Sequence, residues 1–196
     1  MLGLVENMPD GAAARPGDVV TSMSGQTIEV VDTDSEGRLV LADALWYGHQ
    51  RFNPAALVDI ATLTSAMILA LGHHYAGVLS NNDRLADQLL AAADREGELL
   101  WRMPLHGRYA KLIKSPIADV KNYGGQTAGS ITAALFLERF VGSTPWAHLD
   151  IAPIAWRKDS DDARVPNGAT GYGVRLLNRW IERNHEARSA QATAKS

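Results

Sequence analysis

The sequence predicts an α/β domain in which a mixed, partly parallel sheet is flanked by helices on both faces. Residues 57–64 and 146–152 are near-continuous apolar runs, the pattern of strands that are covered on both sides. Stretches with apolar residues at helical spacing separate and follow these runs. A strand, a helix and a strand follow one another over residues 18–64, which predicts a βαβ unit and therefore a parallel pair.

Local patterns predict the remaining elements. Residues 18–31 are rich in β-branched side chains around a Ser-Gly pair, which indicates a hairpin. Residues 1–17 include Pro9, Gly11, Pro16 and Gly17 and indicate an irregular lead-in. A further strand is expected over 75–79, and residues 165–173 form a Gly-rich loop. Helical segments are expected at about 39–51, 82–97, 109–113, 130–141 and 174–183.

Composition places the chain among single globular domains. Its 196 residues suit one domain, which we expect to span 1–184, followed by a disordered tail over 185–196. The formal net charge of −3, with acids and bases interspersed, offers no nucleic-acid surface. There is no cysteine, so a metal would need carboxylates, histidines or carbonyl groups. The sequence shows neither a signal peptide nor a membrane span, and a cytoplasmic protein is expected.

The turn at 32–38 concentrates the most informative side chains. Asp32, Asp34 and Glu36 are followed by Gly37 and Arg38, between an apolar β-branched run and the start of a helix. Carboxylates at such a junction are hard oxygen ligands close to free backbone N–H groups. A divalent-metal site is the first interpretation of this turn, and a solvated acidic turn is the second.

A calcium loop is a further alternative for the same turn. The acids at 32, 34 and 36, the glycine at 37 and Asp43 nearly fit the spacing of an EF-hand loop. An EF-hand needs a helix before the loop, whereas residues 18–31 indicate a hairpin. Helical periodicity also starts at Leu39, inside the loop.

The same residues carry a family resemblance. Asp32–Leu39, with the sequence DTDSEGRL, resembles the NTDAEGRL signature of the leucyl (cytosol) aminopeptidases, which are two-metal exopeptidases. The resemblance continues in segments along nearly the whole chain. These segments are Val5–Pro9, Arg15–Asp18, Val58–Thr64, Trp146–Ala152 and Gly168–Gly171.

The resemblance implies an activity and its cofactors. It implies release of N-terminal residues, of leucine type, from peptides by hydrolysis at two ions of Mn²⁺ or Zn²⁺. By this resemblance Asp34 and Glu36 are metal ligands, with the glutamate bridging both ions. Arg38 matches an arginine used with a bound bicarbonate near the bridging water, and a guanidinium at a helix start suits a small anion.

The resemblance also implies a substrate-binding segment. Thr62, Leu63 and Thr64 match the loop after a strand that lines the family's substrate cleft. A position just past the carboxyl end of a parallel strand is where α/β sheets present ligands. Two positions depart from the family pattern: Asp32 replaces asparagine, and Ser65 replaces glycine.

Only part of the family's metal site is recognisable here. The resemblance covers the later part of the catalytic domain, and the other ligands come from segments with no counterpart in this chain. We therefore expect weak metal binding and little activity from this polypeptide alone. The family relative is expected to be a hexamer. The alternative is a non-catalytic piece, truncated or split, that pairs with a chain bearing the front half, and a calcium module is the third possibility.

Other polar residues in the sequence invite a functional interpretation. Asp59, His148 and Asp150 lie within or beside apolar strands, where polar groups are usually buried and hydrogen-bonded rather than metal-bound. Residues 124–129 (GGQTAG) resemble a phosphate-binding loop only superficially, because the Gly-Lys-Ser/Thr ending is missing. We therefore predict structural roles for these strand residues and no nucleotide site at this loop.

Overall fold

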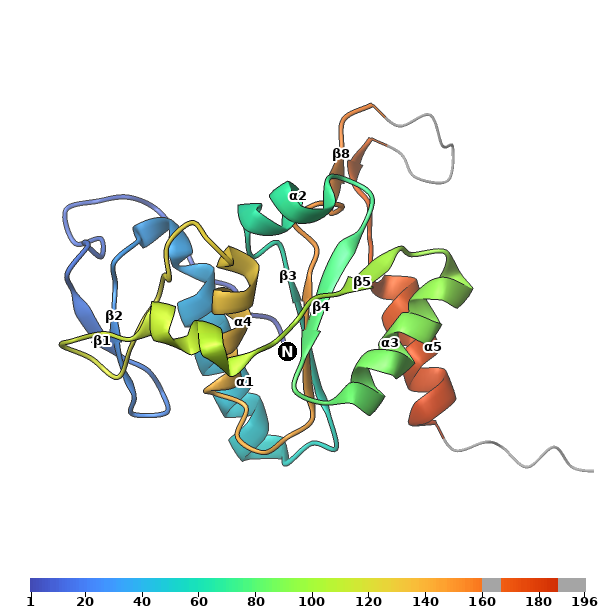
Figure 1. The fold of residues 1–196 in the computed structure, drawn as a ribbon, viewed down its shortest axis with the longest axis horizontal. Helices are drawn as coiled ribbons and strands as arrows, with labels where there is room; N and C mark the ends of the chain where they lie inside the picture. The colour runs from blue at the N-terminus through green and yellow to red at the C-terminus, as the bar shows by residue number, and fades with distance from the viewer. Residues whose placement is uncertain (160–166, 187–196) are drawn as a thin grey trace, which may run out of the picture.

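The computed structural model describes residues 1–159 and 167–186 and contains a central sheet of four strands (Figure 1). Its order is β3-β7-β4-β5. Strands β3 and β7 are parallel, as are β4 and β5, whereas β4 and β7 are antiparallel. The mixed sheet is therefore confirmed. The strands are β3 (Leu57–Ala61), β4 (Ala76–Ser80), β5 (Leu100–Arg102) and β7 (Trp146–Asp150).

Helices cover both faces of this sheet, as the sequence predicts (Figure 1). One face packs against α1 and α4 around a buried core that includes Phe136, Phe140 and Trp146. The other face packs against α3 and α5 around Leu89 and Leu176. The helices are α1 (Gly37–Phe52), α2 (Ser65–Leu71), α3 (Asp83–Glu96), α4 (Gly129–Glu138) and α5 (Val174–Asn184).

Smaller elements surround this core. The expected hairpin is present as β1 and β2, with Val20 opposite Ile28 and Gly25 in the left-handed region. Strand β6 pairs in parallel with β2, and β8 pairs with β9. These elements are β1 (Val19–Thr21), β2 (Thr27–Glu29), β6 (Val120–Lys121), β8 (Trp156–Arg157), β9 (Gly168–Ala169) and the 3₁₀ helices η1 (Thr33–Ser35) and η2 (Gly107–Ile113).

The expected βαβ unit over residues 18–64 is wrong. Strands β2 and β3 flank α1 but belong to different sheets, because β2 pairs with β6 and β3 pairs with β7. Both partners come from far along the chain, and such long-range pairing leaves no local sequence signal. Residues 65–71, for which no element was predicted, form the short helix α2, which starts at the N-cap Thr64 and ends before Gly72.

Two predictions extend beyond the described residues. From residue 187 onward the predicted disordered tail lies outside them, as do residues 165 and 166 of the predicted Gly-rich loop. Over 1–159 and 167–186, no helix has the length and apolar character needed to cross a membrane.

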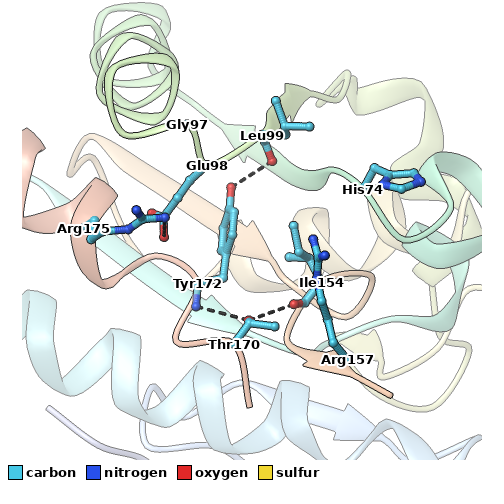
Figure 2. Close-up of a pocket in the computed structure, with 9 residues that line it drawn as sticks. All are labelled: His74, Gly97, Glu98, Leu99, Ile154, Arg157, Thr170, Tyr172 and Arg175. Atoms are coloured by element: carbon cyan, nitrogen blue, oxygen red, sulfur yellow. Dashed lines mark hydrogen bonds and ion pairs between the residues drawn. The ribbon is translucent and has the colours of Figure 1, made fainter. Parts of the chain in front are cut away.

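A buried glutamate joins the two helices on one face of the sheet (Figure 2). Glu98, only 6% exposed, follows α3 and accepts hydrogen bonds from the N–H groups of Gly173 (3.3 Å) and Leu176 (2.9 Å). Gly173 is the N-cap of α5 and has no side chain to cap the helix, so Glu98 provides the cap from a distant part of the chain. Arg175 lies 3.5 Å from the same carboxylate.

We expect Glu98→Ala to lower the free energy of unfolding by about 2–4 kcal/mol, because buried helix N–H groups lose a charged acceptor. Glu96→Ala is the matched control, since Glu96 only pairs with the partly exposed Arg179. The free energy of unfolding should fall by only about 0–1 kcal/mol in Glu96→Ala, which is typical for a surface ion pair. Equal losses in the two variants, measured by urea denaturation, would contradict a capping role for Glu98.

Candidate functional site

Three segments meet at the carboxyl ends of β3 and β7 and enclose a cavity of about 450 Å³. They are the acidic turn with the start of α1, the loop from β3 into α2, and the loop before α4. Each segment leads into the first turn of a helix, so backbone N–H groups concentrate around the cavity. The lining residues are Asp32, Asp34, Ser35, Arg38, Leu63, Thr64, Ser65, Ala66, Leu69, Tyr123, Gly125, Gln126 and Gly129.

Asp32 has a structural role in the acidic turn. Its backbone is extended, and its carboxylate accepts from Asp34 N–H (3.2 Å) and from the Ser35 hydroxyl (2.9 Å). Asp32 therefore caps η1, a role that an asparagine oxygen could also fill. As an aspartate, it also places one negative charge on the cavity wall.

Asn122 holds the acidic turn against β6. It is fully buried, and its side-chain oxygen accepts from the N–H groups of Val31 (2.9 Å) and Asp32 (3.3 Å). Its amide nitrogen donates to the carbonyl of Asp32 at 2.6 Å. The end of the β2 segment is thereby fixed at the point where the acids begin. Asn122 was not predicted from the sequence, since a lone asparagine before a glycine run has no distinctive pattern.

Arg38 is the buried cation of the cavity. It is 4% exposed, its Nη1 donates to the carbonyl of Asn122 at 2.5 Å, and its guanidinium lies 5.7 Å from the centre of the Tyr123 ring. Burial lowers the pKa of Arg38, although nearby negative charges, chiefly that of Asp32, act in the opposite direction. Within the described residues no group accepts a hydrogen bond from its buried Nε. A buried donor of this kind suits a small anion.

Asp150 fixes the loop that follows β3. Its fully buried carboxylate accepts from Leu63 N–H (3.1 Å), Thr64 N–H (3.4 Å) and the Thr64 hydroxyl (2.6 Å). The Thr64 hydroxyl also lies 2.8 Å from that of Ser130, in the first turn of α4. One side chain at the end of β7 thus determines the backbone course of the loop beside the cavity.

The cavity brings together four of the six residues singled out from the sequence. Asp34, Arg38, Leu63 and Thr64 all line it. Glu36 is half-buried and Thr62 is exposed, and neither belongs to the lining. Glu36 occupies the N-cap position of α1, where its side chain makes no capping hydrogen bond.

The donor chemistry fits a divalent ion only in part. Asp34 and Glu36 offer the hard oxygen ligands that Mn²⁺ and Zn²⁺ accept. Across residues 1–159 and 167–186, however, no group of three or more His, Cys, Asp or Glu side chains is placed to hold a metal ion. An EF-hand arrangement has no support either, because β1 and β2 precede the turn and α1 begins at Gly37.

Asp59, His148 and Asp150 are buried and hydrogen-bonded, as the sequence analysis predicts. Asp59 accepts from Trp146 Nε1 (2.7 Å) and lies 2.6 Å from His148 Nδ1. Burial, the largest influence, lowers the pKa of His148, but the charge and hydrogen bond of Asp59 with the charge of Asp150 outweigh it and raise the pKa overall. Asp59 and His148 face each other inside the sheet, on β3 and β7.

The loop before α4 contributes to the cavity, which was not predicted from the sequence. Residues 124–129 were considered only as a nucleotide loop, yet Gly125, Gln126 and Gly129 form one wall of the cavity. Gly125 has a φ of 94° and Ala128 a φ of 55°, so the loop turns sharply before the helix. The glycines that precede this apolar helix were the sequence signal that could have predicted a binding loop here.

Fold and site together define an α/β protein with a ligand cavity at the carboxyl ends of parallel strands, where such folds bind their ligands. The family model described as "Cytosol aminopeptidase family, catalytic domain" matches residues 1–178. The chain therefore belongs to the cytosol aminopeptidase family.

Curated relatives and solved structures agree with this family. The "Probable cytosol aminopeptidase" of Caulobacter vibrioides is 66% identical over 95% of this chain and 38% of its own length, and that of Sinorhizobium fredii is 59% identical over 95% and 37%. The chain thus spans less than two fifths of these relatives. A mutant of tomato leucine aminopeptidase is 47% identical with a TM-score of 0.85, covering 91% of this chain and 34% of its own. The bottromycin maturation enzyme BotP in complex with Mn is 44% identical with a TM-score of 0.87, covering 92% and 40%.

Asp150→Ala should lower the free energy of unfolding by about 2–4 kcal/mol, because it leaves buried N–H groups and a hydroxyl without their acceptor. Asp87→Ala, at an exposed position of α3, is the control and should change stability by less than about 0.5 kcal/mol. Urea denaturation provides both values. Hydrogen exchange at Leu63 and Thr64 should also accelerate in Asp150→Ala alone, and unchanged exchange there would contradict the loop-fixing role.

The His148–Asp59 pair predicts a pH dependence of stability. The pKa of His148 is raised on folding, so the stabilisation is complete below the unfolded-chain value of about 6.5 and is lost as the pH rises through the folded value. The stability advantage of the parent chain over His148→Gln should therefore shrink as the pH is raised from about 6 to 9. Asp59→Asn removes the charge that raises this pKa and should remove the slope. An advantage that grows with pH would contradict the assignment.

Proposed function

We propose that this chain forms the later part of a metal-dependent aminopeptidase catalytic domain, which releases N-terminal amino acids of leucine type from peptides by two-metal hydrolysis. The observation that carries this proposal is the cavity at which Asp34, Arg38, Leu63 and Thr64 meet. Since the chain covers 38% of its relative from C. vibrioides, the activity belongs to an assembly larger than these residues. We treat residues 1–184 as one partial domain and a cytoplasmic location as part of the same proposal.

The residues of the turn have distinct roles in this proposal. Asp34 and Glu36 would hold the divalent ions through their carboxylate oxygens, and Glu36 would be the ligand common to both ions. When bound, a pair of divalent ions lowers the pKa of a shared water and polarises the substrate carbonyl. The manganese in the related BotP structure supports Mn²⁺, and Zn²⁺ is the alternative.

Arg38 and the loop after β3 act on the anion and the peptide. Arg38, with its buried and unpartnered Nε, holds a small anion such as bicarbonate beside the acids. Leu63 and Thr64, fixed by Asp150, orient the peptide along the cavity wall, and the exposed Thr62 contacts the peptide outside the cavity. Positioning by a fixed backbone loop restricts the substrate before reaction, which lowers the entropic part of the barrier.

In this proposal the chain contributes two metal ligands, Asp34 and Glu36. Two carboxylates are fewer than two ions need, so the remaining ligands come from the region that precedes the matched part in the relatives. The second candidate is therefore a non-catalytic piece that gains activity only with that region, and the hexamer is the expected state of the completed enzyme.

Two variants test the metal ligands. Asp34→Asn and Glu36→Gln should each weaken Mn²⁺ binding by about tenfold or more, because each replaces a charged ligand with a neutral amide. Asp94→Asn, at an exposed position on α3, is the matched control and should leave Mn²⁺ affinity unchanged. Titration followed by the electron paramagnetic resonance of free Mn²⁺ gives the affinities. Undiminished binding in both site variants would remove these residues from the metal site.

Activity is measured in the same preparations with leucine p-nitroanilide and added Mn²⁺ or Zn²⁺. We expect little or no turnover from the 196-residue chain alone, since its ligand set is incomplete. Turnover by the chain alone that Glu36→Gln abolishes would show that these residues suffice for catalysis and would contradict the proposed need for a further region.

A further inference from the structure

A second cavity, of about 130 Å³, is lined by residues from the end of α3, from β8, from the loop after β9 and from α5 (Figure 2). It shares no lining residue with the cavity at Asp34 and Arg38. Its volume has room for several water molecules but is below the roughly 300 Å³ at which sites for drug-sized ligands begin. The second cavity therefore suits a small ligand.

The hydroxyl groups in the wall of this cavity already donate within the protein. The Tyr172 hydroxyl donates to the carbonyl of Leu99 (3.0 Å), and the Thr170 hydroxyl donates to that of Ile154 (2.8 Å). Burial, followed by the charge of Glu98, raises the pKa of Tyr172, so its proton stays on the hydroxyl. Because each hydroxyl has a single proton, neither has a donor left for a ligand.

The acid in the wall, Glu98, is balanced by its own partners. Its carboxylate accepts hydrogen bonds from the N–H groups of Gly173 (3.3 Å) and Leu176 (2.9 Å) at the start of α5. The guanidinium of Arg175 lies 3.5 Å from the same carboxylate. One positive charge and the helix start therefore offset the negative charge of Glu98, and its lone pairs are not free to bind a cation.

Arg157 of β8 is a cation of the cavity that has no such balance. The residue is half-buried, and across residues 1–159 and 167–186 its guanidinium pairs with no acid and donates to no carbonyl. Since Glu98 and Arg175 offset each other, the wall has one uncompensated positive charge. A negatively charged ligand would balance it.

Apolar groups lie beside this free guanidinium. Figure 2 shows the guanidinium of Arg157 next to Ile154, on the opposite side of Tyr172 from Arg175. Both Ile154 and Tyr172 are buried. A guanidinium forms two parallel hydrogen bonds with a carboxylate, which fixes the direction of the bound group. A ligand held in this way can place a short aliphatic group against Ile154 and the ring of Tyr172.

We propose that the second cavity binds a small aliphatic carboxylate, whose carboxylate group pairs with Arg157. The single uncompensated charge favours a monoanion over a dianion such as phosphate, because a second negative charge would face Glu98 without a partner. The exposed His74 stands at the rim and leaves the cavity accessible from solvent. This proposal rests on charge and shape and does not depend on the proposed metal chemistry.

Two kinds of molecule share this chemistry. One is a branched aliphatic acid without an amine, and the other is a free amino acid such as leucine, which the proposed reaction releases. Both present a carboxylate and a short apolar body, and they differ in the ammonium group. Titration with each of them separates the two sources.

The test is a titration of the 196-residue chain at constant ionic strength, followed in ¹H–¹⁵N correlation spectra. The first two probes are 3-methylbutanoate and 3-methylbutylamine, which have nearly the same shape and opposite charges. We expect 3-methylbutanoate to shift the amide signals of Leu99, Ile154 and Thr170 to saturation. The amine should bind at least about tenfold more weakly, because Arg157 repels it. Leucine and inorganic phosphate are titrated in the same way.

Variants of one residue locate the carboxylate. Arg157→Gln should weaken the binding of 3-methylbutanoate by about tenfold or more, because it removes the charge and the paired donors. Arg157→Lys keeps the charge without the planar fork and should lose less affinity. Arg183→Gln, at an exposed position of α5, is the matched control and should bind like the parent chain. Circular dichroism checks the fold of each variant. The comparison of acid with amine needs only the parent chain and tests the proposal even if Arg157→Gln is misfolded.

Saturation by both 3-methylbutanoate and leucine would support the proposal and assign the cavity to free amino acids. Saturation by 3-methylbutanoate without leucine would support it and assign the cavity to acids that lack an amine. Equal binding of the acid and the amine, equal affinities of Arg157→Gln and Arg183→Gln, or phosphate binding as tight as that of the acid would each overturn it. Peptide hydrolysis is not measured in this experiment, so its failure would leave the proposed function intact.

Discussion

The buried carboxylate of Asp150 is the contact on which the site depends. It stands where β7 ends, and it accepts hydrogen bonds from the backbone of Leu63 and Thr64 where β3 gives way to α2. A fully buried carboxylate must satisfy its lone pairs within the protein, so the loop has little freedom to move. Sheet pairing brings the two strands together, and this carboxylate converts their pairing into a fixed cavity wall.

The same sheet contains a second buried acid, which has a different structural role. Asp59 lies opposite His148 in the pairing of β3 with β7, and its bonds to His148 and Trp146 keep it inside the core. These two aspartates lie on adjacent parallel strands, and their roles differ because their positions along the strands differ. The one in mid-strand joins neighbouring strands, whereas the one at the strand end holds a loop. Position along the strand determines which of them can influence a ligand.

The sequence predicted the elements of this fold well and their pairing poorly. Helical spacing and apolar runs identified α1, α3, α4, α5 and the strands β3, β4 and β7, because these signals are local. The assumed pairing of the segment before α1 with the one after it was wrong, since β2 and β3 join partners from residues 120–121 and 146–150. The acidic signature singled out Asp34 and Arg38, and both line the cavity. Asn122 and the wall at 125–129 were missed, because their importance arises only when distant segments meet.

The cavity combines a buried arginine with carboxylates, and their opposite charges offset one another. Buried Arg38 and the uncapped starts of α1 and α4 all favour negative charge at the same place. A cation alone would be repelled there, so the acids at 32, 34 and 36 are needed to offset the guanidinium. An anion held at the unpartnered Nε of Arg38 would reduce that repulsion further. The acids and the arginine come from residues 32–38, and the start of α4 joins them from residue 129, so the charge distribution of the cavity depends on two segments that meet only in the folded chain.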